Sequence, residues 1–141
     1  MALIKIWIHF VWTTKKREPL LTSDVKSKMI EHIKNNAIEK EIFIDSIDGS
    51  KEHLHLLISL GGKQSVAEVA QLLKGESSFW INSEKLVKGK FTWQHEYFAV
   101  SVSESVLPKV RKYIRNQEEH HRKKTFTEEY DDFMRKYGFH E

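Results

Sequence analysis

The chain has 141 residues, which suits one domain, because a domain commonly holds roughly 100 to 200 residues. Its 23 Lys and Arg against 20 Asp and Glu give a net charge of +3, so any affinity for nucleic acid depends on where the cations lie. Cysteine is absent, which excludes disulfides, thiolate nucleophiles and Cys-ligated metal sites, and the 40% hydrophobic content excludes a mainly disordered chain.

The first half of the chain predicts a strand, a helix and a hairpin. Between residues 4 and 12 apolar and other residues alternate with the period of a strand. From Ser23 to Ala37 the apolar residues follow helical spacing, over about four turns. Two extended runs, 41–48 and 53–60, are joined by an Asp-Gly-Ser turn, which predicts adjacent antiparallel strands.

The second half predicts one more strand and three helices. A helix over 66–81 is expected to be broken or loosened near Gly75, and residues 95–102 alternate as a strand. A third helix is expected from about 106 to 121 and a short last helix over 126–137. The resulting order, β-α-β-β-α-β-α-α, predicts a single α+β domain over 1–141, with a ferredoxin-like (RRM-like) split βαβ fold: an antiparallel sheet with two helices on one face.

The sequence predicts neither a signal peptide nor a membrane-spanning segment. The apolar start of the chain contains Lys5 and His9 and lacks a small-residue cleavage site, so it does not resemble a signal peptide. No apolar run approaches the roughly 20 residues that cross a bilayer. We therefore expect a cytoplasmic protein without membrane contact.

His53 and His55 are the first candidate site. Residues two apart in a strand share a face, so both imidazoles lie opposite the Leu54 and Leu56 face that packs beneath the helices. Their Cβ atoms would be about 6.6 to 6.8 Å apart, and two such nitrogens can hold one divalent ion. For an isolated His-x-His pattern, the more common interpretation is two polar side chains on a solvated sheet face.

Tyr113 and Gln117 are the second candidate site. They are four residues apart, so they project from one helix face, with Arg111, Lys112 and Arg115 around them. Alone, the pair is most simply a half-buried amphipathic residue beside a solvated one. Together with the His pair, however, a metal, a phenol and cations are the parts of a phosphoryl-transfer centre that uses covalent catalysis.

These two motifs resemble a known family. Residues 52–58, Glu-His-Leu-His-Leu-Leu-Ile, are similar to the HUH signature (His, hydrophobic, His), and residues 113–117, Tyr-Ile-Arg-Asn-Gln, are similar to the Tyr-x-x-x-Gln helix of single-tyrosine HUH transposases from small insertion sequences. Residues 11–17, 73–75 and 93–94 resemble further stretches of that family, so the likeness covers nearly the whole chain. Glu52 is a small departure, because the family more often has Asp there.

The resemblance implies a site and a reaction. His53, His55 and Gln117 would ligate a divalent metal, Mg²⁺ or Mn²⁺. Tyr113 would attack a phosphodiester of single-stranded DNA, forming a 5′-phosphotyrosine and freeing a 3′-hydroxyl. The DNA would carry hairpins at the ends of the element, and cleavage and rejoining there would move it. A homodimer with composite active sites is also implied, in which the tyrosine helix of one subunit can complete the His pair of the other.

The cations of the chain are candidates for binding the DNA backbone. Phosphate contacts of this kind make affinity depend on salt concentration. A solvated charged surface is an equally good interpretation of any single cation. The candidate residues are Lys15, Lys16, Arg17, Lys74, Arg111, Lys112 and Arg115. His120 and His121 could also tune the site or contact DNA.

Other functions stay open at this stage. A domesticated relative could cleave and join hairpin-bearing repeats without belonging to a mobile element. A non-catalytic ferredoxin-like module could bind nucleic acid with an incidental His pair. A two-His phosphodiesterase is a weaker alternative, because that chemistry needs two separated His-x-Ser/Thr motifs, and the sequence has no such pair.

Overall fold

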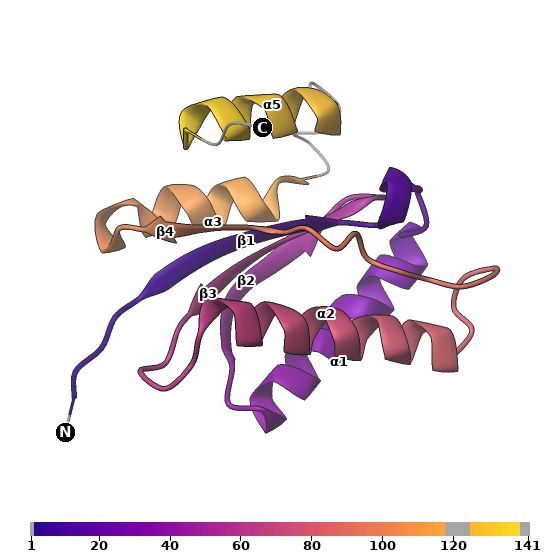
Figure 1. Cartoon of the computed structure of the whole chain (residues 1–141), viewed down its shortest axis with the longest axis horizontal. Coiled ribbons are helices and arrows are strands. Elements are labelled where there is room, and N and C mark those ends of the chain that lie inside the picture. Colours follow the sequence, from indigo (N-terminus) through magenta and orange to yellow (C-terminus); the bar gives the residue numbers. More distant parts are fainter. Residues whose placement is uncertain (1, 118–124, 139–141) are drawn as a thin grey trace.

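An antiparallel sheet of four strands forms the centre of the molecule, in the order β2-β3-β1-β4 (Figure 1). The structure is a computed structural model and describes residues 2–117 and 125–138. The strands are β1 (Trp7–Thr13), β2 (Phe43–Gly49), β3 (His53–Ser59) and β4 (Phe98–Val102). β3 is paired on both sides, with β1 and with β2. The predicted α+β class, element order and ferredoxin-like plan are confirmed.

Helices lie on both faces of this sheet (Figure 1). One face is covered by α1 (Ser23–Glu39) and α2 (Val66–Ser83). The other is covered by α3 (Leu107–Arg115), with α5 (Phe126–Lys136) above it. Two short 3-10 turns, η1 (Lys15–Arg17) and η2 (Glu104–Val106), follow β1 and β4. Within the described ranges, no helix is both long and apolar enough to cross a membrane.

The two long helices begin at side-chain caps and bury one face each. The Thr22 hydroxyl accepts a hydrogen bond from the amide of Val25, and the Ser65 hydroxyl accepts one from the amide of Glu68, which satisfies an amide that a helix start leaves open. Their buried faces pack on the apolar side of the sheet, where Phe10, Leu54 and Leu56 are each 0% exposed. This is the main core of the molecule.

The helix expected to break near Gly75 is continuous. α2 runs through this position over 18 residues. A glycine inside a helix costs roughly 1 kcal/mol relative to alanine. Burial of four apolar α2 side chains against the core outweighs that cost by fixing the helix on both sides of the glycine. Those side chains are Val69, Ala70, Leu73 and Ile81.

The expected fourth strand is shorter than predicted. β4 begins at Phe98 rather than at residue 95. Just before it, the carbonyls of Gln94 and His95 accept hydrogen bonds from the Lys74 ammonium at 2.7 and 2.8 Å. These carbonyls therefore bond to α2, which separates the continuous pairing of β4 with β1 from the isolated bridge between Thr14 and Trp93.

The tyrosine-bearing helix also ends earlier than predicted. α3 ends at Arg115, and Asn116 follows in a non-helical conformation with φ −100° and ψ 28°. Residues 118–121 of the expected helix, which include His120 and His121, lie outside the described residues. The last helix, α5, agrees with the predicted range within one residue at its end, and Gly138 follows with a positive φ of 70°.

Candidate active site

His53 and His55 project from β3 toward α3 and α5, and both are buried. Their exposed fractions are 0% and 1%, so the prediction of a solvated His face is wrong. α3 places Leu107 and Ile114 against Trp7 and Leu57 on this side, forming a second apolar cluster that excludes water. The turn before His53 needs Gly49, because a Cβ there would lie 2.1 Å from the His53 carbonyl oxygen.

The contacts of His53 fix which of its ring nitrogens faces the site. Nδ1 lies 2.9 Å from a Glu52 carboxylate oxygen, which accepts a hydrogen bond from it, and Nε2 lies 3.1 Å from Gln117 Oε1. The Gln117 amide nitrogen donates to the Tyr113 carbonyl at 2.9 Å, which leaves the amide oxygen facing His53. With Nδ1 donating to Glu52, Nε2 is the nitrogen of His53 that faces the site, and metal-ligating histidines commonly have such a partner on their other ring nitrogen.

His55 is oriented in a similar way by another histidine. Its Nδ1 lies 2.9 Å from Nε2 of His9, on β1. Burial, together with the nearby charge of His55, lowers the pKa of His9 to about 3, so His9 is neutral at neutral pH. A neutral His9 can accept a hydrogen bond from Nδ1 of His55, so Nε2 is the nitrogen of His55 that faces the site. Sequence reasoning did not assign His9 this role, because the contact with His55 depends on how the strands pair.

Tyr113 projects from α3 into the same cluster. Its ring centroid lies 5.4 Å from that of His55, and its hydroxyl donates a hydrogen bond to Glu129. Burial and the negative charge of Glu129 both raise the pKa of the Tyr113 phenol above its ordinary value. In this state the phenol is therefore protonated, and its oxygen is engaged with a carboxylate.

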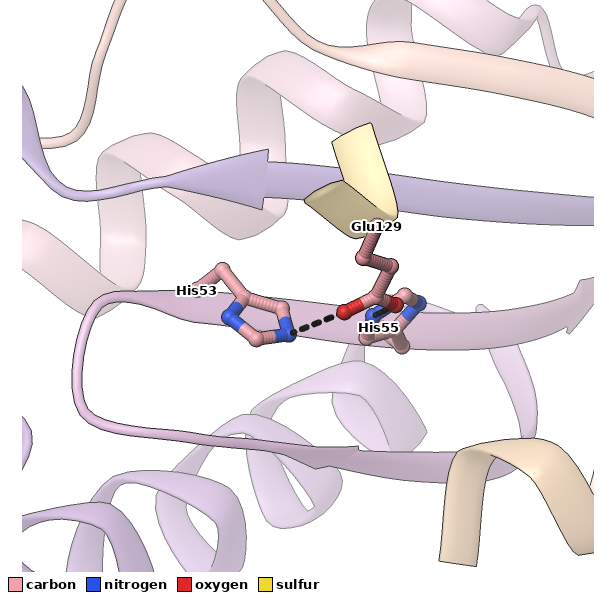
Figure 2. Close-up of side chains that lie close together, drawn as sticks. All are labelled: His53, His55 and Glu129. Carbon is pink, nitrogen blue, oxygen red and sulfur yellow. Dashed lines mark ion pairs between the residues drawn. The ribbon is translucent and has the colours of Figure 1, made fainter. Parts of the chain in front are cut away.

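Glu129 is a site residue that sequence reasoning missed. Figure 2 shows its side chain descending from α5 between His53 and His55, with the carboxylate facing both rings. One carboxylate oxygen lies 3.1 Å from His55 Nε2 and the other 3.9 Å from His53 Nε2. Burial would raise the Glu129 pKa, but hydrogen bonds from His55 and Tyr113 outweigh burial and lower it to about 2. Glu129 is therefore an anion at neutral pH.

One sequence signal could have singled out Glu129. It stands three residues after Phe126 and four before Phe133, at the spacing of an apolar helix stripe. A carboxylate in such a stripe points toward whatever the stripe packs on. Its neighbours Glu128 and Asp131 are also acidic, so composition alone does not distinguish it from them.

The donor atoms of this cluster fit a divalent cation. One nitrogen each from His53 and His55 and one Glu129 oxygen all lie within 4.8 Å of one another. Two ligands at about 2.1 Å from one ion and at right angles are about 3.0 Å apart, close to the 3.1 Å separations found here. Imidazole nitrogens with carboxylate and amide oxygens suit Mn²⁺ and related ions, and oxygens suit Mg²⁺.

The predicted DNA-binding cations divide into two groups. Three are engaged within the fold: Arg17 donates to the Thr127 hydroxyl at 3.0 Å, Lys74 holds the loop before β4, and Arg111 makes two 2.9 Å hydrogen bonds to Asp45. The other four side chains are exposed: Lys15, Lys16, Lys112 and Arg115. Arg17 is exposed too, although its guanidinium is engaged with Thr127, so these four side chains are the better placed for phosphate contacts.

One cleft borders the cluster, and a second is lined by Tyr130 of α5 without touching the cluster residues. The first, of about 660 Å³, is lined by His9, Tyr113 and Glu129, with Lys109 and Lys136 at its walls. The other, of about 1070 Å³, lies between η1, β4 and α5 and combines Lys16 and Arg17 with aromatic rings from Tyr97, Phe98 and Tyr130. Tyr113 therefore has an open volume beside it, although the His pair is covered.

Comparisons with known proteins identify the family of the chain. The family model described as "Transposase IS200 like" matches residues 2–117. The ISDra2 transposase TnpA of Deinococcus radiodurans is 26% identical over 115 residues, which cover 77% of this chain and 81% of the relative.

Two solved structures share the fold. A crystal structure from Deinococcus radiodurans r1, described as that of a transposase, superposes with a TM-score of 0.67 at 23% identity and covers 82% of this chain and 93% of its own. A REP-associated tyrosine transposase bound to a REP hairpin gives a TM-score of 0.60 at 16% identity, covering 87% of this chain and 71% of its own. With the family model matched over most of its length, the chain belongs to the IS200-like transposases.

Proposed function

We propose that this transposase cleaves and rejoins single-stranded DNA through a covalent bond to Tyr113, with a divalent ion, Mg²⁺ or Mn²⁺, held by His53, His55 and Gln117. One observation carries the proposal. The phenol of Tyr113 lies against the His pair, with 5.4 Å between the ring centroids of Tyr113 and His55, although the two residues come from different elements. Nothing about the apolar core requires a phenol, two imidazoles and an amide to meet at this point.

The reaction is a phosphoryl transfer that conserves its bonds. The Tyr113 oxygen forms a bond to phosphorus while the bond from phosphorus to the 3′-oxygen of the preceding nucleotide breaks. The proton that the phenol gives up ends on that 3′-oxygen, so the products are a 5′-phosphotyrosine and a free 3′-hydroxyl. Attack by a 3′-hydroxyl on the phosphotyrosine reverses the step and rejoins DNA without nucleotide hydrolysis.

The residues around Tyr113 have distinct tasks in this scheme. A bound divalent ion would withdraw charge from the scissile phosphate. Glu52 and His9 hold the rings of His53 and His55 in position, and Gln117 is held by the Tyr113 carbonyl. The four-residue spacing therefore keeps Tyr113, the nucleophile, and Gln117, the third metal ligand, on the same side of the chain.

The DNA substrate is proposed to be single-stranded, with hairpins at the ends of the element. A REP-associated relative of the same fold is bound to a REP hairpin, which supports hairpin DNA as the substrate class here. The exposed cations Lys15, Lys16, Lys112 and Arg115 can hold its phosphates. Unpaired bases can stack on the rings that line the 1070 Å³ cleft.

The homodimer with composite active sites, implied by the family resemblance, stays a prediction. In this single chain Tyr113 lies beside the chain's own His pair. Mixing Tyr113→Phe subunits with His53→Ala subunits tests the arrangement, because cleavage returns on mixing only if one subunit completes the site of the other.

The nucleophile is tested by incubating 3′-labelled single-stranded DNA from the element's ends with protein and Mn²⁺ or Mg²⁺. We expect a protein-linked product from wild type and none from Tyr113→Phe, with DNA binding by gel shift within about twofold, since only the hydroxyl is removed. Tyr130→Phe is the matched control: it removes a hydroxyl in the same region but keeps the ring that packs 5.1 Å from Phe98 and lines the 1070 Å³ cleft, so it should still form the covalent product. A covalent product from Tyr113→Phe would overturn the assignment.

The same experiment separates the alternatives. A domesticated relative would form the covalent product on repeat hairpins but not on the ends of a mobile element. A non-catalytic binding module would shift both DNAs in a gel and form no covalent product with either ion.

A further inference from the structure

The helix α5 lies outside the part of the chain that the family model matches, yet it enters the active site. The match ends at residue 117, and α5 begins at Phe126. Contacts on either side of Glu129 fasten this helix: Thr127 accepts from Arg17 at 3.0 Å, and Tyr130 packs on Phe98 at 5.1 Å and under the Arg17 guanidinium at 4.9 Å. Glu129 is thus held over the His pair by its neighbours.

The carboxylate of Glu129 faces the Nε2 atoms of His53 and His55. The orientation of each ring is set by a hydrogen bond of its other nitrogen, Nδ1. Glu52 accepts a hydrogen bond from Nδ1 of His53, and His9 can accept one from Nδ1 of His55. Both Nε2 atoms then face the Glu129 oxygens, 3.1 and 3.9 Å away. A carboxylate at 5% exposure needs a positive partner: a proton on His55 Nε2 supplies it in the hydrogen bond described above, and a divalent cation between the three groups would take the place of that proton.

We propose that Glu129 is a ligand of the divalent ion, so that α5 supplies one wall of the metal centre. This inference rests on the proposed metal site at His53 and His55 and adds to it a ligand from outside the family's matched domain. A carboxylate brings a negative charge that the neutral set of two imidazoles and one amide lacks, which strengthens binding of hard cations. Metal binding and docking of α5 are then linked, because each holds the other in place.

Manganese affinity tests the proposal directly. Protein is titrated with Mn²⁺, and free aquo-Mn²⁺ is measured by electron paramagnetic resonance, without DNA. We expect Glu129→Gln, which keeps the shape and removes the charge, to weaken Mn²⁺ binding at least about tenfold, the lower end of what even outer-shell changes cost. Glu128→Gln is the matched control: it removes the same charge one residue away, where Glu128 is exposed and caps the helix with Thr125.

The outcomes separate this inference from the proposed function. Weaker binding by Glu129→Gln, with Glu128→Gln like wild type, supports it. Equal or tighter binding by Glu129→Gln, while His53→Ala loses the ion, overturns the role of Glu129 and leaves the His site standing. Binding that His53→Ala does not change, or no binding by wild type, overturns both.

Hydrogen exchange gives a second readout that does not depend on affinity alone. In wild type, Mn²⁺ should slow amide exchange in α5, since the ion fastens Glu129 to β3. In folded Glu129→Gln, checked by circular dichroism, Mn²⁺ at saturating concentration should leave α5 exchange unchanged. Equal protection of α5 in both proteins would contradict a ligand role.

Discussion

The two faces of β3 are equally buried but differ in chemistry. Leu54, Leu56 and Ile58 are 0% exposed against α1 and α2, and His53 and His55 are 0% and 1% exposed against α3 and α5. The first face needs only apolar neighbours. On the second face every imidazole has a polar partner, because a buried polar group without one is costly. The two faces therefore differ in the polarity of their buried partners and not in exposure. We call the side with His53 and His55 the reactive face and the side with Leu54, Leu56 and Ile58 the structural face.

The largest expected difference between the faces is in stability. Leu56→Ala removes a fully buried side chain from the α1 and α2 face and should lower the free energy of unfolding by about 2 to 5 kcal/mol. Urea denaturation followed by circular dichroism measures it. Leu72→Ala, at a position 40% exposed on α2, is the control and should change stability by less than about 1 kcal/mol. Equal effects of the two substitutions would contradict this division.

Substitution of His55, the residue before Leu56, should instead change how much Mn²⁺ stabilises the folded protein. At Mn²⁺ concentrations a hundred times the dissociation constant, a single site stabilises the folded protein by about 2.7 kcal/mol. His55→Ala should lose this gain, whereas Leu56→Ala should keep it on a lower baseline. Thermal denaturation with and without Mn²⁺ measures both. If His55→Ala gained as much from Mn²⁺ as wild type, the ion would be bound elsewhere.

The smallest expected effect on stability comes from the ion pair between Arg111 of α3 and Asp45 of β2, which holds α3 on the reactive face. Burial raises the pKa of Asp45, but hydrogen bonds from Arg111 outweigh it and hold this pKa below its usual range. A depressed carboxyl pKa stabilises the fold above the unfolded value, about 3.9, and the stabilisation is lost as pH falls through the folded pKa. Asp45→Asn should therefore be less stable than wild type at pH 7, and the difference should shrink toward pH 2.

Denaturation of both proteins across this pH range is the measurement. The side chain of Arg111 is 38% exposed, so solvent screens the pair and the effect should be smaller than that of Leu56→Ala. Asp24→Asn, whose partner Lys28 lies on the same exposed helix face, is a control with a weaker pH dependence. A pH-independent difference for Asp45→Asn would show that packing, not charge, holds α3 there.

The sequence predicted the two faces of β3 but not what covers them. Alternation with a period of two assigns His53 and Leu54 to opposite sides whatever the rest of the chain does. Burial of the His face depends on where α3 and α5 dock. The sequence of an amphipathic helix shows which side is apolar but not which surface that side packs on. The prediction of a solvated His face was wrong for this reason.

Site residues within one element were easier to find than those that meet across elements. His53 with His55, and Tyr113 with Gln117, lie at fixed spacings on one strand and near one helix. His9 joins His55 through the pairing of β1 with β3, where Val11 stands opposite His55. Glu129 joins the cluster through tertiary packing of α5, which no local spacing reports.

The central position of β3 has a consequence for the order in which the site comes apart. Its residues are paired over the whole strand, with β1 on one side and β2 on the other. Amides of such a strand exchange with solvent only through global opening, whereas a helix packed on the outside of a sheet can detach by local opening at lower free energy. On warming, we therefore expect the carboxylate and the phenol to leave first, while the two imidazoles stay together until the whole domain melts.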